Sequence, residues 1–342
     1  MDSAQWLAAA IAAFLAAAVP TFLYILLIRW LDRYEKEPAW LLAAAFLWGA
    51  MPAVIISLIF EFVLGLPWQL AGTTLLTAFV EASLIAPVVE EVVKALALWG
   101  LLTLFRAEFD DVLDGVIYGA LIGFGFAMTE HFFYLLGSFG EGGFSSLAVT
   151  AVLRVGVFGF THAVFTAITG AGFGYARNAP NRAAGRLVVL VALAGAIAFH
   201  AVHNFGATLV QAAPGALVLS LANNTAGILL VAVIVVLALS QEKRWIAEEL
   251  KDEIGVSLNE EGYAVLIRRR AGVARRMGRL ACLAGIRVTK MAELRRLATE
   301  LAFKKAQYRA GDRSPKLEET IARLRQELIA LQDAFACPTD LG

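Results

Sequence analysis

Seven apolar runs, each about 20 residues or longer, constrain the fold of this chain more than any other feature. A helix of that length crosses the hydrocarbon core of a bilayer. The composition agrees, because 59% of the 342 residues are hydrophobic and only 17% are charged, which is too apolar for a soluble globular domain. The sequence therefore predicts an all-α, polytopic membrane helix bundle of about seven transmembrane helices, at 4–28, 40–64, 73–105, 112–136, 147–175, 187–210 and 216–239.

Basic residues between the runs gather at alternate ends. They follow the first, third, fifth and seventh runs, and the other ends carry none. Because positive residues concentrate in cytoplasmic loops, this pattern predicts an N-terminus outside the cell and a C-terminus in the cytoplasm. The residues concerned are Arg29, Arg33, Lys36, Arg106, Arg177, Arg182, Arg186, Lys243 and Arg244.

The composition changes after residue 240. Of the 29 Lys and Arg residues, nine lie before residue 241 and 20 after it, and leucines recur there at three- and four-residue spacing. We predict a transmembrane domain at 1–240 and a cytoplasmic helical domain of unknown role at 241–342. Its basic stretch 268–279 either lies on anionic lipid headgroups or forms a solvated helix face. Cys282 and Cys337 imply neither a disulfide framework nor a cysteine-rich metal site.

Several ionisable residues lie inside the apolar runs, where a charge costs roughly 2.5–3.5 kcal/mol and marks a candidate functional site. Counting along the helices places Glu90 and Glu91, His162 and His200 near mid-membrane, with Glu130 somewhat nearer the outer side. These side chains could converge at one level. The full set is Glu61, Glu81, Glu90, Glu91, Lys94, Asp114, Glu130, His131, Arg154, His162, His200 and His203.

The spacing within each run sharpens these candidates. Glu90 and Lys94 are four residues apart and can pair on a helix, whereas Glu90 and Glu91 point about 100° apart. We therefore expect Lys94 to hold one carboxylate while the other faces a cavity, and the spacing leaves open which does which. His200 and Asn204 also share a helix face. Pro87 is expected to kink the third run near the two glutamates.

Two further sequence features have structural explanations. Gly115, Gly119 and Gly123 form a small-residue ridge that allows another helix to approach closely. Asp111 and Asp114 stand at the expected start of the fourth helix, where acidic side chains favour the helix dipole.

Carboxylate, imidazole and amide groups at one depth can hydrolyse a bond. A glutamate can take a proton from water, and His with Asn can donate hydrogen bonds to a developing oxyanion. The same groups can bind zinc, which lowers the pKa of a bound water, although the HExxH signature is absent. Both a zinc site and a metal-free mechanism stay open, and the candidate ligands are His162, His200, Glu91 and Glu130.

In four motifs the chain resembles the PrsW family of bacterial intramembrane proteases, relatives of the CAAX prenyl endopeptidase and Abi superfamily. The resemblance spans roughly residues 29–239 and leaves the tail unassigned. The motifs are Glu90-Glu91-Val-Val-Lys94, the stretch from Asp111 to Glu130, Arg154 followed by Phe158-Gly-Phe-Thr-His162, and His200-Ala-Val-His-Asn204. His131 and His203 depart from the residues common in the family and add potential metal ligands.

The resemblance implies hydrolysis of peptide bonds in membrane-protein or membrane-bound peptide substrates, in the bacterial cytoplasmic (inner) membrane. It assigns Glu90 or Glu91 as the base and His162 as its partner. His200 and Asn204 would be the oxyanion donors. Lys94, Glu130 and Arg154 would be supporting residues. The lipid bilayer is an implied partner, nucleic acid is not, and the oligomeric state is open.

Two other functions use the same residues. The buried glutamates and histidines could form an ion relay in a membrane transporter. Alternatively, the chain could be a catalytically silent scaffold that holds a substrate helix. Loss of cleavage on replacing the candidate residues would distinguish the protease from both.

Overall fold

The computed structural model describes residues 2–31, 36–72, 74–210, 212–267, 285–309, 311 and 313–333. Within these ranges the regular structure is helical, and the β-type pairing is limited to one isolated bridge between Ile254 and Leu258. The all-α prediction is confirmed. The chain divides into two compact units, one comprising Met1–Asp32 with Glu37–Val236 and the other Arg33–Lys36 with Leu237–Gly342. The basic stretch 268–279, Cys282 and Cys337 lie outside the described residues.

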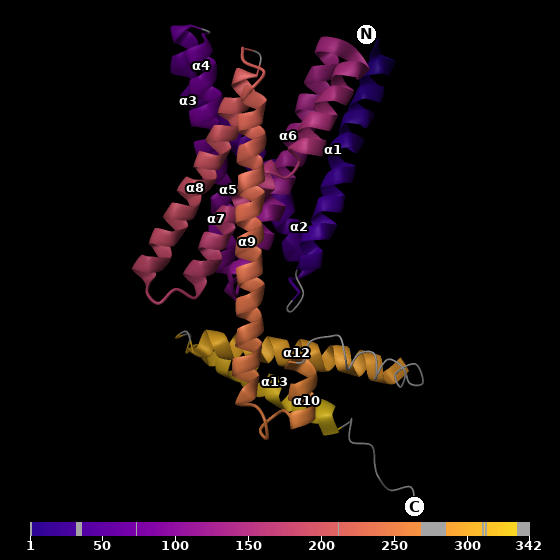
Figure 1. Ribbon diagram of the computed structural model, residues 1–342, viewed down its shortest axis with the longest axis vertical. Coiled ribbons are helices and arrows are strands. Elements are labelled where there is room, and N and C mark those ends of the chain that lie inside the picture. Colours follow the sequence, from indigo (N-terminus) through magenta and orange to yellow (C-terminus); the bar gives the residue numbers. More distant parts are fainter. Residues whose placement is uncertain are drawn as a thin grey trace, which may run out of the picture. The chain divides into compact units, whose positions relative to one another are not determined.

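The first unit is a bundle of long apolar helices (Figure 1). Three of them are interrupted by short π-helical segments, labelled η1, η2 and η4. In chain order the elements are α1 (Ser3–Leu31), α2 (Ala39–Trp48), η1 (Gly49–Ala53), α3 (Val54–Ala71), α4 (Leu75–Val80), η2 (Glu81–Ile85), α5 (Ala86–Leu104), the 3₁₀ turn η3 (Arg106–Glu108), α6 (Val112–Ala151), η4 (Val152–Val157), α7 (Thr161–Arg177), α8 (Arg182–Leu209) and α9 (Ala216–Lys251), which continues into the second unit.

Five segments of the described chain are long and apolar enough to cross a membrane. One of them, Val112–Arg177, has 66 residues and leaves helical geometry at Gly142 and Gly143, where the chain folds back. Gly143 has a φ of +67°, which glycine adopts without strain. The segment 75–104 also has bilayer length but carries Glu90, Glu91 and Lys94, so its charge excludes it from the five. When the two halves of Val112–Arg177 are counted separately and the segment 75–104 is added, the segments correspond to the seven apolar runs of the sequence.

The glycine ridge of α6 packs directly against α7. A Cβ atom on Gly119 would lie 2.4 Å from the carbonyl oxygen of Thr166, and one on Gly123 would lie 2.4 Å from that of His162. Any side chain at these positions would therefore push the two helices apart. The predicted role of the ridge is confirmed, and it sets the distance between the polar residues of the two helices.

The π-helical segments lie beside the polar centre of the bundle, and in each one a backbone carbonyl accepts a side-chain hydrogen bond from another helix. Such segments insert an extra residue into a helical turn and occur frequently at functional sites. Pro87 stands just after η2, so the predicted irregularity lies in the turn that precedes the proline. The three bonds run from Thr129 to the Ala50 carbonyl (2.6 Å), from Asn204 to the Ala82 carbonyl (2.8 Å) and from Tyr24 to the Val155 carbonyl (3.1 Å).

Asp111 and Asp114 form a cap at the start of α6. The side chain of Asp111 accepts hydrogen bonds from the backbone amides of Leu113 and Asp114 at 2.7 and 3.2 Å. Asp114 accepts in return from the Asp111 amide at 3.0 Å. This reciprocal capping satisfies amides that have no partner within the helix, and it confirms the structural explanation given from the sequence.

The second unit packs the end of α9 with α10 (Glu260–Ile267), α12 (Gly285–Arg309) and α13 (Pro315–Asp333). The leucines that recur at helical spacing lie in its core. Glu253 is buried in this unit, where Lys305, Arg325 and Ser257 all donate hydrogen bonds to its carboxylate. The buried core residues on α12 and α13 include Leu294, Leu297, Leu301, Leu317, Ile321, Leu324 and Leu328.

Candidate active site

Lys94 lies at the centre of the buried polar cluster of α5. Its Nζ atom is 3.0 Å from Oε2 of Glu90 and 2.9 Å from Oε1 of Glu91, and the side chain is completely buried. The same ammonium lies 3.1 Å from Nδ1 of His162 and 3.8 Å from the ring centre of Phe126. The expectation that Lys94 holds only one carboxylate is therefore wrong, since both glutamates contact it.

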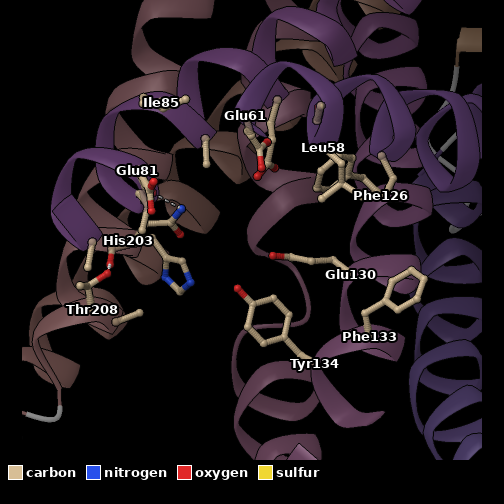
Figure 2. A pocket seen from close by; sticks show the side chains of 18 of the residues that line it. Leu58, Glu61, Glu81, Ile85, Phe126, Glu130, Phe133, Tyr134, His203 and Thr208 are labelled. Atoms are coloured by element: carbon tan, nitrogen blue, oxygen red, sulfur yellow. Dashed lines mark hydrogen bonds between the residues drawn. The ribbon is translucent and has the colours of Figure 1, made fainter. Parts of the chain in front are cut away.

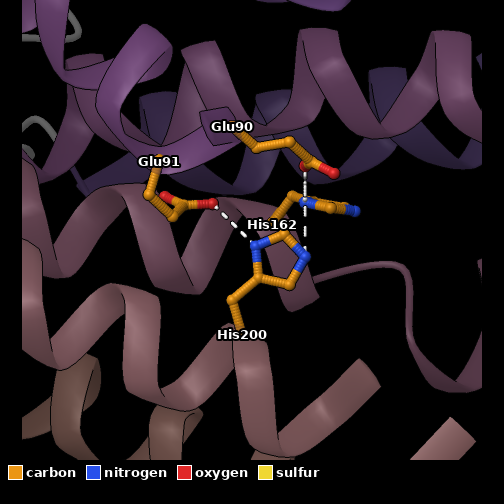
Figure 3. Close-up of side chains that lie close together, drawn as sticks. All are labelled: Glu90, Glu91, His162 and His200. Carbon is orange, nitrogen blue, oxygen red and sulfur yellow. Dashed lines mark hydrogen bonds and ion pairs between the residues drawn. The ribbon is translucent and has the colours of Figure 1, made fainter. Parts of the chain in front are cut away.

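Glu91 is the interior carboxylate of the pair. It is fully buried, and both of its oxygens have partners. Oε1 accepts from Lys94 and lies 3.1 Å from Nδ1 of His200, while Oε2 accepts a hydrogen bond from Thr166 at 3.2 Å. Figure 3 shows Glu91 and His200 facing each other. These contacts fix the position of Glu91 and orient the His200 ring, with its Nδ1–H directed to the carboxylate.

Glu90 faces the other way. Its Oε2 atom contacts Lys94 and lies 3.7 Å from Nδ1 of His162 and 4.0 Å from Nε2 of His200 (Figure 3). Its Oε1 atom has no hydrogen-bond partner among the described residues, and the side chain lines a large pocket. Of the two adjacent glutamates, Glu90 is thus the one that faces a cavity.

His162 is held from both sides by charged groups. Its Nε2 atom lies 2.7 Å from Oε2 of Glu130, which also pairs with Arg154 at 3.0 Å. The guanidinium of Arg154 stacks over the ring of Tyr134 at 3.5 Å. Because a carboxylate can only accept, the neutral ring donates from Nε2 and leaves Nδ1 to accept from Lys94. Glu130 and Arg154 therefore fix the orientation and tautomer of His162.

The pocket beside Glu90 has a volume of about 870 Å³ and is lined by residues of α3, α4, η2, α5, α6, η4 and α8 (Figure 2). It extends from Glu90 to Gln69 near the end of α3 and Thr208 near the end of α8. The pocket therefore leads from Glu90 towards that end of the bundle. Asn204 also lines the pocket, although its Nδ2 atom already donates one hydrogen bond to the Ala82 carbonyl.

Comparison with known proteins identifies the family. Residues 37–239 match the model of the PrsW family intramembrane metalloproteases, which covers more than half of the chain. The chain belongs to this family. With its apolar helices, membership makes it a multi-pass membrane protein.

Three curated members of the family show the extent of the likeness. The chain is 33% identical over 151 residues to Protease PrsW of Geobacillus kaustophilus, which is 43% of this chain and 59% of that protein. It is 36% identical over 123 residues to Protease PrsW of Clostridioides difficile, 36% of this chain and 50% of that protein. The match to Protease PrsW of Bacillus subtilis is 28% identical over 158 residues, which is 44% of this chain and 63% of that protein. The chain thus matches between half and two thirds of each relative, and no solved structure matches it.

The family description implies a metal ion, and the buried cluster has suitable ligands. One donor atom from each of Glu90, Glu91, His162 and His200 lies within 4.8 Å of all the others. Imidazole and carboxylate are ordinary zinc ligands, so the donor set fits this metal. The ammonium of Lys94 already contacts three of these four residues, so a metal bound by them would replace the ammonium as their positively charged partner.

This group of four differs from the ligand set expected from the sequence. Glu90 belongs to it, whereas Glu130 pairs instead with His162 and Arg154. His203 lies outside it, with its Nδ1 atom 3.0 Å from the Ser220 hydroxyl. His131 is also outside the group and is buried, and neither of its ring nitrogens has a hydrogen-bond partner among the described residues.

Two side chains of the cluster escaped the sequence analysis. Phe126 covers the Lys94 ammonium, and Thr166 donates to Glu91. A weak signal existed for Thr166, because it stands four residues after His162 and so shares its helix face. Phe126 gave no signal, since one apolar residue in an apolar helix is indistinguishable from its neighbours.

Proposed function

We propose that this member of the PrsW family hydrolyses peptide bonds of membrane-protein or membrane-bound peptide substrates, with Glu90 as the base that activates water. The observation that carries the proposal is the Oε1 atom of Glu90, which has no hydrogen-bond partner in the described part of the chain and faces a pocket of about 870 Å³. Glu91, whose two oxygens both have donors, is proposed to hold Lys94 and His200 in place.

In the proposed reaction a water molecule binds at Oε1 of Glu90. Glu90 takes one proton as the water oxygen attacks the substrate carbonyl, and it then gives that proton to the leaving amine. The imidazole of His200, held at Nδ1 by Glu91, and the amide of Asn204 are the proposed hydrogen-bond donors to the oxyanion. His162 acts as the partner of Glu90 through Lys94, whose ammonium contacts both side chains.

If zinc binds here, Glu90, Glu91, His162 and His200 would hold it, and it would lower the pKa of a bound water. The roles of the outer residues do not depend on that choice. Glu130 and Arg154 orient His162, and Thr166 orients Glu91.

We also propose a location and an orientation. The basic residues Arg29, Arg106 and Arg182 stand at helix ends opposite the pocket opening at Gln69 and Thr208. Since basic residues favour the cytoplasmic side, the pocket opens outward from the cytoplasmic (inner) membrane of a bacterium, and the N-terminus lies outside.

The experiment compares protein N-termini in membranes of cells that make the wild-type chain or the Glu90→Gln variant. New N-termini within or beside transmembrane segments are expected with the wild type and not with the variant. Glu327→Gln is the matched control, because among the described residues this partly exposed carboxylate pairs with one helix neighbour in the tail, Arg323. Identical N-termini in wild-type and Glu90→Gln membranes would overturn the proposal.

A further inference from the structure

The pocket beside Glu90 is markedly acidic. Four carboxylates line it, belonging to Glu61, Glu81, Glu90 and Glu130, against one permanent cation, Arg154. Glu130 pairs with Arg154, and Glu90 pairs with Lys94, which it shares with Glu91. Glu61 and Glu81 have no basic partner among the described residues. Two carboxylates in one pocket thus lack a counter-charge.

The polar groups of α3 follow one face of the helix. Ser57, Glu61 and Gln69 lie four and eight residues apart, with Gly65 at the remaining position of this face, and the three polar residues line the pocket. Ser57 is only 1% exposed, and its hydroxyl has no hydrogen-bond partner among the described residues. A buried hydroxyl without a partner is costly, so a ligand group that bonds to it would be stabilised.

Glu81 approaches this face from η2. Its Oε1 atom is buried and has no hydrogen-bond partner among the residues that the structure describes, and a Cβ atom added to Gly65 would lie only 3.0 Å from it. Gly65 therefore leaves room for the carboxylate. Figure 2 shows Glu61, Glu81 and Glu130 around the same hollow.

We propose that Glu61 and Glu81, with Ser57, form a subsite that binds a lysine or arginine side chain of the substrate next to the scissile bond. A cationic side chain supplies the missing counter-charge and several N–H donors for the free oxygens. The subsite lies between Glu90 and the open end of the pocket, so it selects substrates with a basic residue near the cleavage site. This inference rests on the proposed protease function.

The test uses a substrate cleaved by the wild-type chain, found by the comparison of N-termini described above, and the full chain in lipid nanodiscs. Each Lys or Arg within about six residues of the cleaved bond is replaced by Gln. We expect one replacement to lower kcat/KM by about ten- to a hundredfold, the range for a hydrogen bond to a charged group. The double variant Glu61→Gln/Glu81→Gln should lose the same factor on the native substrate.

The decisive result is the combination of the two changes. With the double variant, the Lys or Arg replacement in the substrate should have almost no further effect, because the interaction is already gone. Glu141→Gln, an exposed carboxylate in the 112–151 helix, is the control and should keep both the wild-type kcat/KM and the preference. The single variants Glu61→Gln and Glu81→Gln serve the same test if the double variant does not fold.

The outcomes separate the two proposals. If the wild-type chain cleaves nothing, the protease function fails. If it cleaves substrates that need no nearby Lys or Arg, or if the preference is unchanged in the Glu61 and Glu81 variants, the subsite is overturned and the protease function stands. If the pocket bound a free N-terminal amine of the substrate instead, N-acetylation of the substrate would lower kcat/KM and the Gln replacements would not. That result would also overturn the subsite.

Discussion

Both compact units of the protein bury a glutamate against a lysine, and the surroundings of the two carboxylates differ. In the tail unit every oxygen of Glu253 has a donor, from Lys305 at 2.5 Å, Arg325 at 2.8 and 3.0 Å and Ser257 at 2.7 Å. In the membrane unit one oxygen of Glu90 contacts Lys94, and the other faces a pocket. Burial of a charge is common to both clusters. The difference is an acceptor left free for a ligand.

The difference has a physical basis. A buried carboxylate with all its donors in place is stabilised where it is, and a substrate could bind only by displacing one of them. A buried carboxylate with a free oxygen beside a pocket can bind a water or a substrate without that cost. The cluster around Glu90 also contains two imidazole rings, each of which has one nitrogen that can donate and one that can accept a hydrogen bond, whereas the partners of Glu253 are permanent cations and a hydroxyl.

The largest contrast is expected in activity. Glu90→Gln removes the proposed base and should lower peptide cleavage by a factor of about 10²–10⁴. Glu253→Gln is the same chemical change in a cluster that has no proposed catalytic role. It should keep the cleavage rate within about twofold of the wild-type rate. The measurement is turnover of a mapped substrate by each variant in nanodiscs. If Glu90→Gln and Glu253→Gln lowered cleavage equally, the free oxygen of Glu90 would have no special catalytic role.

Lys94 is expected to be the most important single cation for stability. Lys94→Met leaves two adjacent buried carboxylates without their shared counter-charge, and breaking a buried ion pair costs about 3–5 kcal/mol. The free energy of unfolding in mixed micelles measures this. Adding Glu91→Gln to Lys94→Met should restore part of the loss, because one of the uncompensated charges is then removed. No restoration in the double variant would argue that Lys94 acts by packing against Phe126 alone.

Loss of Glu253 should cost less. Glu253→Gln leaves Lys305 and Arg325 without their carboxylate, but the Arg325 side chain is 40% exposed and can be hydrated. We expect about 1.5–3 kcal/mol, the range for hydrogen bonds to a charged group. Hydrogen exchange of the α12 and α13 amides in the full chain measures it. Glu327→Gln, which breaks an exposed helix pair with Arg323, should change exchange by no more than about 0.5 kcal/mol and is the control.

The sequence predicted the bundle because its physical signals are strong. Bilayer-length apolar runs define helices, and the glycines at 115, 119 and 123 define a packing face that the structure confirms. It also identified the residues that gather at the centre, since charged groups at membrane depth are rare enough to stand out. Glu90, Glu91, His162 and His200 were all found in this way, and the structure brings their donor atoms together.

The sequence could not resolve how these residues share their contacts. Glu90 and Glu91 lie four and three residues before Lys94 on α5, so whether Lys94 binds one or both depends on the side-chain rotamers, which the residue spacing does not fix. The same holds for Glu130, whose partners come from the fold-back of α6 onto η4. The acidic subsite was equally hidden, because Glu61 and Glu81 lie on different helices 20 positions apart and meet only across the pocket.

The smallest expected effect is a pH dependence confined to the tail unit. Burial raises the pKa of Glu253, but hydrogen bonds from Arg325, Lys305 and Ser257 outweigh it and hold the pKa at about 2, below its ordinary value of 4.5. Because the folded pKa is depressed, the stabilisation is fully present above pH 4.5 and is lost as the pH falls from 4.5 towards 2. Amide exchange in α12 and α13, corrected for its intrinsic pH dependence, should therefore reveal unchanged stability between pH 7 and 5 and a progressive loss below 4.5. In Glu253→Gln this loss should be absent, since the variant has no proton to take up at that position. If the stability of the wild-type tail were unchanged down to pH 3, the donors around Glu253 would fix the side chain without lowering its pKa. The two buried clusters would then differ less than their hydrogen bonds indicate.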